Sequence, residues 1–176
     1  MMRAFALTVL LALAPIAGRA EMLRDISQPM VAVAGFDRAG LLGLWHEVAR
    51  TPTVLEYDCH GVTFDFAPRS DSRLIMRLAC PTGSAAGKVL NIDAVMVETS
   101  PGIFAVNFVR FSAFGTLELV VLSQSAEVLV LGSGLGNVGW VLTREAAPGP
   151  EVVAAGVQVL VDNFYRPGAI ARLDQE

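Results

Sequence analysis

Apolar and polar residues alternate through much of the middle of this chain, which is typical of β-strands that bury one face. In residues 62–66 the apolar positions share one side and are separated by Thr63 and Asp65, and the same period continues in 73–79. Short turns rich in Gly, Pro and Ser separate the apolar runs. Eight strands are expected, at 44–51, 62–67, 73–79, 88–99, 103–111, 116–123, 127–131 and 138–145.

Strands joined by such short turns form an up-and-down antiparallel sheet, and closure removes its exposed edges. The pattern therefore predicts an all-β, eight-stranded antiparallel barrel. Its lumen should be lined by the large apolar residues of the inward faces: Phe64, Phe66, Met76, Leu78, Ile92, Met96, Phe104 and Phe108. Both sides of 103–111 are apolar, so alternation leaves the inward face of that strand open.

The spacing of the apolar residues along the chain changes after Pro148-Gly149-Pro150. Apolar residues in 151–165 follow helical spacing up to Phe164, with Pro150 at the start and Glu151 in the first turn. This predicts one helix packed outside the barrel, followed by a short ninth strand at 169–173. Residues 21–37 should be an irregular lead-in, and Asp37 should cap one helical turn before the first strand.

The first twenty residues have the layout of a secretory signal peptide. Arg3 precedes an apolar run at 4–14, which is too short to span a membrane, and small residues lie before Ala20. We expect cleavage after Ala20, which leaves residues 21–176 as one domain exported to the periplasm or secreted. The residue directly after the expected cut is Glu21 and not a cysteine, so no N-terminal lipid anchor is expected.

The charge of the chain argues against nucleic acid as a partner. It contains 13 Lys and Arg against 17 Asp and Glu, and loss of Arg3 and Arg19 with the leader leaves 11 basic residues and a formal charge of −6. No basic cluster offsets this acidity.

Cys59 and Cys80 are the only cysteines, and in an oxidising compartment they are expected to form a disulfide. Two buried thiols are the alternative. Directly opposed residues of the hairpin have numbers that sum to an even value, whereas 59 and 80 sum to an odd one. Either a bulge intervenes or, as we prefer, the pair lies in frayed strand ends.

Two motifs suggest a family. The sequence Gly43-Leu-Trp45-His46-Glu-Val-Ala-Arg50 resembles the first-strand signature of the lipocalins, in particular the bacterial lipocalins and their apolipoprotein D relatives. The sequence 140–144, Trp-Val-Leu-Thr-Arg, is similar to the last-barrel-strand motif of that family, and a helix and a ninth strand follow it. The order of elements matches over nearly the whole mature chain.

This resemblance implies an eight-stranded calyx that is closed at one end and carries a small apolar ligand. Trp45 would point into the closed base, and Arg144 would lie across its indole and bond backbone carbonyls. Gly43, Trp45, Trp140 and Arg144 are accordingly expected to close the barrel, with both Trp motifs meeting at the base. Two departures are His46, where the family has an aromatic residue, and 123–127, where a typical turn is missing.

The remaining candidates for chemistry are few. His46 and His60 lack further ligands at metal-site spacing, so no metal and no cofactor are expected. Cys59 could act as a nucleophile, but a disulfide explains it better. The glycines at 132, 134 and 136 are read as a hairpin turn and not as a nucleotide loop.

Glu47 is the one ionisable residue expected beside Trp45 on the lumenal face, where 45, 47 and 49 share parity. A buried carboxylate requires a partner, and Arg110 or Asn107 could supply it. An internal hydrogen bond and a contact with the head group of a ligand are both open.

We therefore expect a soluble periplasmic lipocalin, not an enzyme, that carries a small hydrophobic ligand such as a fatty acid or lysolipid. The ligand could come from a membrane. Two alternatives remain at this stage. One is a small outer-membrane barrel, suggested by a mean hydropathy of +0.54. The other is an enzyme on the lipocalin scaffold, although no nucleophile, base and orienting group can be assembled from these residues.

Overall fold

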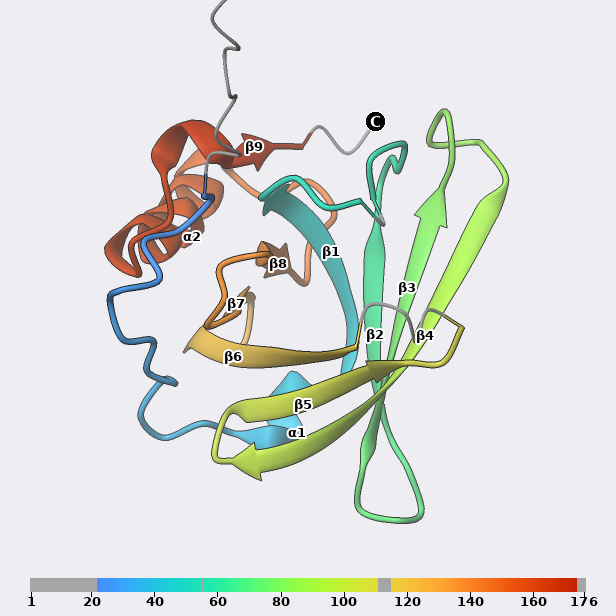
Figure 1. The fold of residues 1–176 in the computed structure, drawn as a ribbon. Coiled ribbons are helices and arrows are strands. Elements are labelled where there is room, and N and C mark those ends of the chain that lie inside the picture. Colours follow the sequence, from blue (N-terminus) through green and yellow to red (C-terminus); the bar gives the residue numbers. More distant parts are fainter. Residues whose placement is uncertain (1–21, 55, 111–114, 174–176) are drawn as a thin grey trace, which may run out of the picture.

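The computed structural model describes residues 22–54, 56–110 and 115–173 of the chain. Eight antiparallel strands form the closed barrel expected from the alternation, and a ninth short strand lies outside it (Figure 1). The strands are β1 (Gly43–Arg50), β2 (Thr63–Pro68), β3 (Leu74–Pro81), β4 (Val89–Ser100), β5 (Ile103–Phe108), β6 (Thr116–Gln124), β7 (Val128–Gly132), β8 (Gly139–Thr143) and β9 (Ala171–Arg172).

Strand β1 closes the barrel by dividing its length between neighbours. Its first half, Gly43 to His46, pairs with β2, and the part from His46 to Arg50 pairs with β8. Beyond the end of the β1–β2 pairing, Ala49 and Arg50 pair with β9. Both ends of the meander therefore meet on one strand.

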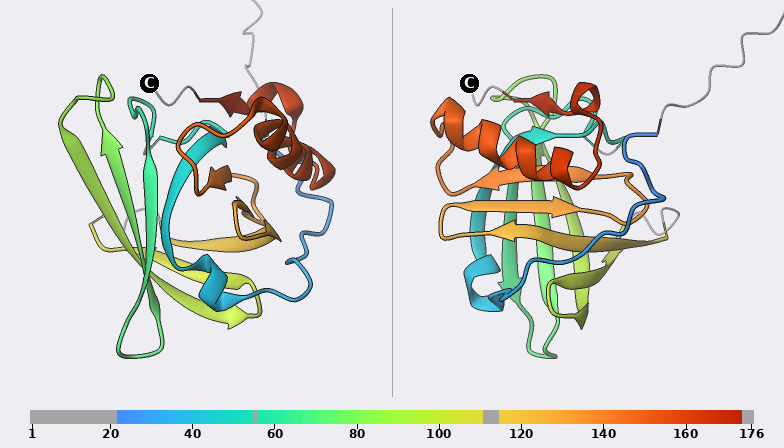
Figure 2. Two further views of the ribbon diagram at one scale, coloured as in Figure 1. Left: turned by 180° about the vertical axis from the view of Figure 1, so that it is seen from behind. Right: turned by 90° about the vertical axis from the view of Figure 1, so that its left-hand side faces the viewer.

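Helix α2 (Pro150–Asp162) lies across the outside of β7 and β8 (Figure 2). Pro150 stands at its start, as expected. The helix approaches the sheet closely at Gly156, where an added Cβ would lie 2.3 Å from Cγ1 of Val141. The expected end at 165 was wrong, because the backbone leaves the helix after Asp162. Phe164 has a φ of +67° and is 45% exposed, so it is not on the buried helix face.

A four-residue helix, α1 (Arg38–Leu41), precedes β1, and a 3-10 turn, η2 (Pro167–Ala169), precedes β9. The carboxylate of Asp37 accepts a hydrogen bond of 2.9 Å from the Ala39 N–H, which confirms the expected cap. The lead-in is irregular as expected, yet it contains the buried Arg24. The Arg24 guanidinium donates to the carbonyls of Gln28, Pro29, Gly134 and Asn163 and so joins the lead-in to the end of α2 and to the β7–β8 loop.

The barrel interior holds one continuous apolar cluster. It includes Phe104, Val106 and Phe108, which settles the inward face of β5. Outward positions of β2, β3 and β4 carry charges instead, since Asp65, Arg77 and Asp93 stand side by side in register. A charged outer row is unlike the apolar outer face that the outer-membrane alternative requires.

Several strand ends differ from the expected ones by a few residues, as is usual for boundaries. The last barrel strand was expected at 138–145 and spans Gly139–Thr143. The fifth ends at Phe108, and the expected end at 111 lies outside the described residues. The expected signal peptide also lies outside them. Among the helices of the described part, none is both long and apolar enough to cross a membrane.

Candidate ligand cavity

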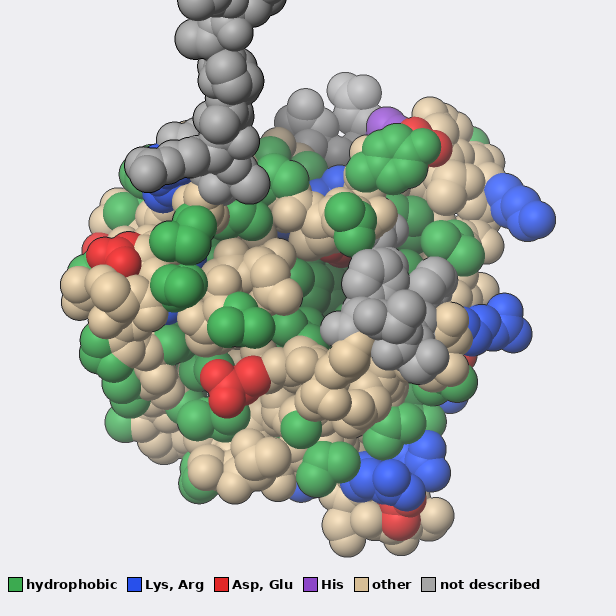
Figure 3. Space-filling view, in the orientation of Figure 1, with side chains coloured by type: hydrophobic (Ala, Val, Ile, Leu, Met, Phe, Trp, Pro, Cys, Tyr) green, Lys and Arg blue, Asp and Glu red, His purple; other side chains and the backbone are tan. Residues whose placement is uncertain are grey.

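A cavity of about 320 Å³ opens at the end of the barrel opposite α1. Its wall is formed by the β1–β2 loop, the β7–β8 loop and the adjoining ends of β3, β5 and β6. Figure 3 shows one face of the molecule with the apolar side chains in green. The described lining residues are Pro52, Thr53, Val54, Glu56, Leu78, Phe108, Thr116, Leu117, Glu118, Ser133, Leu135, Asn137, Val138 and Trp140.

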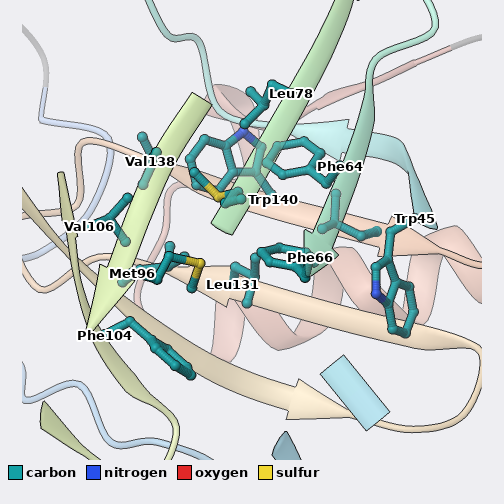
Figure 4. Close-up of a cluster of buried hydrophobic side chains, with 14 of the residues drawn as sticks. Trp45, Phe64, Phe66, Leu78, Met96, Phe104, Val106, Leu131, Val138 and Trp140 are labelled. Carbon is teal, nitrogen blue, oxygen red and sulfur yellow. The ribbon is translucent and has the colours of Figure 1, made fainter. Parts of the chain in front are cut away.

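Of the eight residues predicted to line a lumen, only Leu78 and Phe108 line this cavity. The other six are at most 1% exposed and belong to the apolar cluster in the barrel interior: Phe64, Phe66, Met76, Ile92, Met96 and Phe104. Figure 4 shows Phe64, Phe66, Met96 and Phe104 of this cluster. An eight-stranded barrel is only just wide enough for its side chains to fill. These six side chains therefore fill the middle of the barrel, and the cavity lies beyond them at one end.

A second, smaller recess of about 230 Å³ lies beside the disulfide. Ile92, Leu90 and Tyr57 contribute to it. Cys59 and Cys80 are bonded, with Cα atoms 5.1 Å apart, as expected. Cys59 lies before β2 and forms an isolated bridge with Thr82, out of step with the β2–β3 register, so the preferred explanation, a pair beyond the regular ladder, holds for Cys59. Cys80 remains within β3 and pairs with Leu90.

Glu56 brings a buried carboxylate to the cavity wall. Its Oε2 accepts 2.6 Å from the Thr53 hydroxyl and 3.1 Å from the indole N–H of Trp140. Trp140 in turn contacts the edge of the Phe64 ring, with centroids 5.2 Å apart. Sequence reasoning missed Glu56, because it lies in a loop where alternation predicts nothing about direction.

Behind Glu56, the carboxylate of Glu47 and the guanidinium of Arg50 form a buried ion pair at 2.9 Å. Arg50 also donates 2.6 Å to the backbone carbonyl of Glu56. Arg50 is thus the cationic partner of Glu47, and the expectation of Arg110 or Asn107 was wrong.

A β-bulge in β1 turns the Arg50 side chain inward, toward Glu47. The register against β8 shifts between Glu47 and Ala49, so Val48 and Ala49 both join the outer cluster under α2. Ala49 was expected inside by parity, and instead Arg50 turns inward.

Burial raises the pKa of the Glu47 carboxyl well above its ordinary range, and the charge of Glu56 raises it further, against the opposing charge of Arg50. Burial also raises the pKa of Glu56, although hydrogen bonding to Thr53 and the charge of Arg50 oppose that change. Both carboxyl groups therefore keep a proton to a higher pH than an exposed carboxyl does.

The closed end shows the contact that the family resemblance implied. The Arg144 guanidinium lies 3.6 Å from the centroid of the Trp45 ring and donates to the carbonyls of Gly40, Leu42 and Leu44. Gly43, with a φ of +93°, brings the backbone to within contact of Arg144. The Trp45 indole donates 2.9 Å to the Leu41 carbonyl.

Trp140 does not join this contact. Because β1 and β8 are antiparallel, Trp140 pairs with Arg50, while His46 near Trp45 pairs with Thr143. The two motifs therefore meet at the closed end through Arg144 and Trp45, as expected, while Trp140 itself lies away from that contact. Figure 4 shows Trp140 beside Phe64 and Leu78, away from Trp45.

His46 is half-buried on β1 and His60 is exposed in the loop before β2. Within the described ranges, no group of three or more His, Cys, Asp and Glu side chains is placed to hold a metal ion. Gly132 ends β7, and Gly134 and Gly136 lie in the β7–β8 loop, so these glycines belong to a hairpin, as read from the sequence.

A closed eight-stranded antiparallel barrel with an outer helix and a short ninth strand is the lipocalin fold. The sequence model of the family described as "lipocalin-like domain" matches residues 36–173, and this chain belongs to the lipocalin family. No curated protein matches its sequence.

Solved structures with similar folds include lobster apocrustacyanin A1, with 12% sequence identity, 80% coverage of both chains and a TM-score of 0.65. Apocrustacyanin C2 is similar at 13% identity, 80% coverage of both chains and a TM-score of 0.64. The cockroach allergen Per a 4 has 13% identity, covers 85% of this chain and 94% of its own, and gives a TM-score of 0.63. At these identities the likeness concerns the fold.

Proposed function

We propose that this chain is an exported carrier that binds one small hydrophobic ligand in the cavity at the open end of the barrel. The observation that carries this proposal is the cavity itself. Its volume of about 320 Å³ lies at the lower end of the range of ligand sites, and its wall is mainly apolar, with Leu78, Phe108, Leu117 and Val138 beside Trp140. Lipocalin-fold proteins typically bind small hydrophobic ligands inside the barrel.

Burial of hydrocarbon supplies the affinity, at roughly 25 cal/mol per Å² of apolar surface removed from water. The packed middle of the barrel limits how deep a ligand can reach, so the cavity suits a short or compact molecule. The polar atoms of Thr53, Glu56 and Ser133 provide the few fixed hydrogen-bonding positions that orient a ligand in an apolar site. Binding and not catalysis is the proposed role.

Titration with N-phenyl-1-naphthylamine, an uncharged apolar fluorophore, tests the binding role. We expect saturable binding of one molecule per chain and displacement by organic-solvent extracts of the host's membranes. Val138→Phe places extra volume in the cavity and should weaken binding at least about tenfold, equivalent to about 1.4 kcal/mol. Val97→Phe makes the same change at a position 39% exposed on β4 and should leave binding unchanged. Absence of saturable binding by the folded protein would remove the proposal.

Export is supported by the disulfide, which forms and persists in oxidising compartments, and by the expected leader. Fractionation of expressing cells and N-terminal sequencing test it. We expect the mature chain to begin at Glu21 in the periplasmic or secreted fraction. Recovery of folded protein only after detergent treatment of outer membranes would contradict this location.

A further inference from the structure

The polar groups of the cavity wall are unbalanced in charge. Its described lining includes two carboxyl side chains, Glu56 inside and the exposed Glu118, and no Lys, Arg or His. Residues 55 and 111–114, which lie outside the described part, are uncharged by sequence. The nearest buried cation, Arg50, is committed to Glu47 and to the Glu56 carbonyl. A ligand in the cavity therefore meets negative charge without a cation to bind.

The wall is also unbalanced in hydrogen bonding, because its inner donors are already used. The Thr53 hydroxyl donates to the Glu56 carboxylate at 2.6 Å, and the Trp140 indole N–H donates to the same oxygen at 3.1 Å. The Ser133 hydroxyl donates to the Asn137 side-chain carbonyl at 2.5 Å. At the rim, the Thr116 hydroxyl donates to Asn107. What remains on these groups is oxygen lone pairs, which accept hydrogen bonds.

Both the charge and the hydrogen bonding of the cavity wall would weaken the binding of a carboxylate ligand. Deep inside the cavity it would give up its hydration beside donors that are already used, and a buried unpaired charge is costly. The N–H groups that the Asn137 side chain keeps belong to an exposed lining residue. The ligand would also lie near the carboxylate of Glu56 on the cavity wall. An alcohol or an amine brings its own N–H or O–H, and the Thr53 oxygen and the Glu56 carboxylate can accept from it.

We propose that the cavity selects an apolar ligand whose polar group is a neutral or cationic hydrogen-bond donor, an alcohol or an amine, and discriminates against carboxylates of the same chain length. This inference rests on the proposed binding function and specifies the ligand class for the same cavity. It replaces the sequence-based expectation of a fatty acid.

A matched series tests the selectivity. Decanol, decylamine, methyl decanoate and decanoate are compared at neutral pH as competitors of N-phenyl-1-naphthylamine, each below its aggregation threshold. We expect decanol and decylamine to bind at least about tenfold more tightly than decanoate, which corresponds to about 1.4 kcal/mol. Methyl decanoate, which is neutral but lacks a donor, should bind more weakly than decanol.

Two variants locate the cause. Thr53→Val removes a wall acceptor and should weaken decanol about fivefold while leaving decanoate unchanged. Glu56→Gln removes the negative charge and supplies an N–H, so the preference for decanol over decanoate should shrink to about twofold or less. Glu145→Gln, an exposed change at the closed end, should keep the wild-type ratio. Binding of the fluorophore shows that each variant is folded.

The outcomes separate the two proposals. If the fluorophore and all four competitors fail to bind, the proposed carrier function itself is lost. If the fluorophore binds and decanoate competes as well as decanol, the carrier function stands and the inferred ligand class is overturned. The wild-type series alone decides this, even if Glu56→Gln does not fold.

Discussion

The carboxylate of Glu47 and the guanidinium of Arg50 meet at 2.9 Å inside the barrel, although they stand three positions apart on one strand. Regular alternation would put them on opposite faces. The bulge between Glu47 and Ala49 turns both inward and leaves Val48 under α2. The Glu47 side chain has no exposed surface and that of Arg50 is 11% exposed, so the pair is shielded from solvent.

The raised pKa values of the buried Glu47 and Glu56 carboxyls predict a stability that falls as pH rises. In the folded protein both carboxyls have raised pKa values, so the fold retains a proton that the unfolded chain releases above about pH 4.5. The associated stability is complete below that pH and is lost as pH rises through the folded-state pKa. Glu47→Gln removes one titrating carboxyl at nearly the same side-chain volume, so it should match the wild type in acid and exceed it in stability at higher pH.

Urea unfolding across a pH series measures this difference, whose slope should reach at most about 1.4 kcal/mol per pH unit for one proton. The exposed Glu145→Gln serves as the control and should follow the wild-type profile. Parallel profiles for Glu47→Gln and the wild type would show that no proton is retained at this site.

Replacement of Arg144 should weaken the closed end. Arg144→Met loses the contact with the Trp45 ring and three hydrogen bonds to backbone carbonyls, and we expect a loss of about 2–3 kcal/mol in the free energy of unfolding. Arg77→Met is the matched control, because its ion pairs are longer, at 3.7 and 3.9 Å, and its side chain is 54% exposed. It should cost less than about 0.5 kcal/mol. Equal losses in the two variants would refute a special role for the Trp45 contact.

The disulfide should contribute through the unfolded chain. Cys59 and Cys80 are separated by 21 positions, and closure of a loop of that size stabilises a fold by about 3 kcal/mol in the chain-entropy description. The double variant Cys59→Ser with Cys80→Ser should lose about that amount in chemical unfolding. Reduction of the wild type with a thiol should give the same loss, whereas no effect of reduction would be inconsistent with a bonded pair in the purified protein.

The packed middle of the barrel should respond to substitution differently from the cavity. Phe66 is 1% exposed and does not line the cavity, so Phe66→Ala should cost about 3–5 kcal/mol in stability but leave the affinity for N-phenyl-1-naphthylamine within about twofold. Phe164→Ala, at a residue 45% exposed, should change stability by less than about 0.5 kcal/mol. A large loss of probe affinity in a folded Phe66→Ala protein would indicate that the ligand reaches the middle of the barrel.

Much of the fold follows from local pattern in the sequence. Alternation located all eight barrel strands and identified the inward faces of β2, β3 and β4, because the period of two along a strand depends only on the backbone. Asp37 as a cap and Pro150 as a helix start are likewise local effects. The contact of Arg144 with Trp45 followed from the family resemblance and not from spacing.

The site depended on relations that no local pattern contains. A single bulge reversed the direction of Ala49 and Arg50, antiparallel pairing moved Trp140 to the end opposite Trp45, and a loop delivered Glu56 to the cavity. Six of the eight predicted lumen residues became packed core, because the volume left inside a barrel depends on how all its side chains fit together. The sequence determined which residues face inward, and only the tertiary structure decided which of them leave space for a ligand.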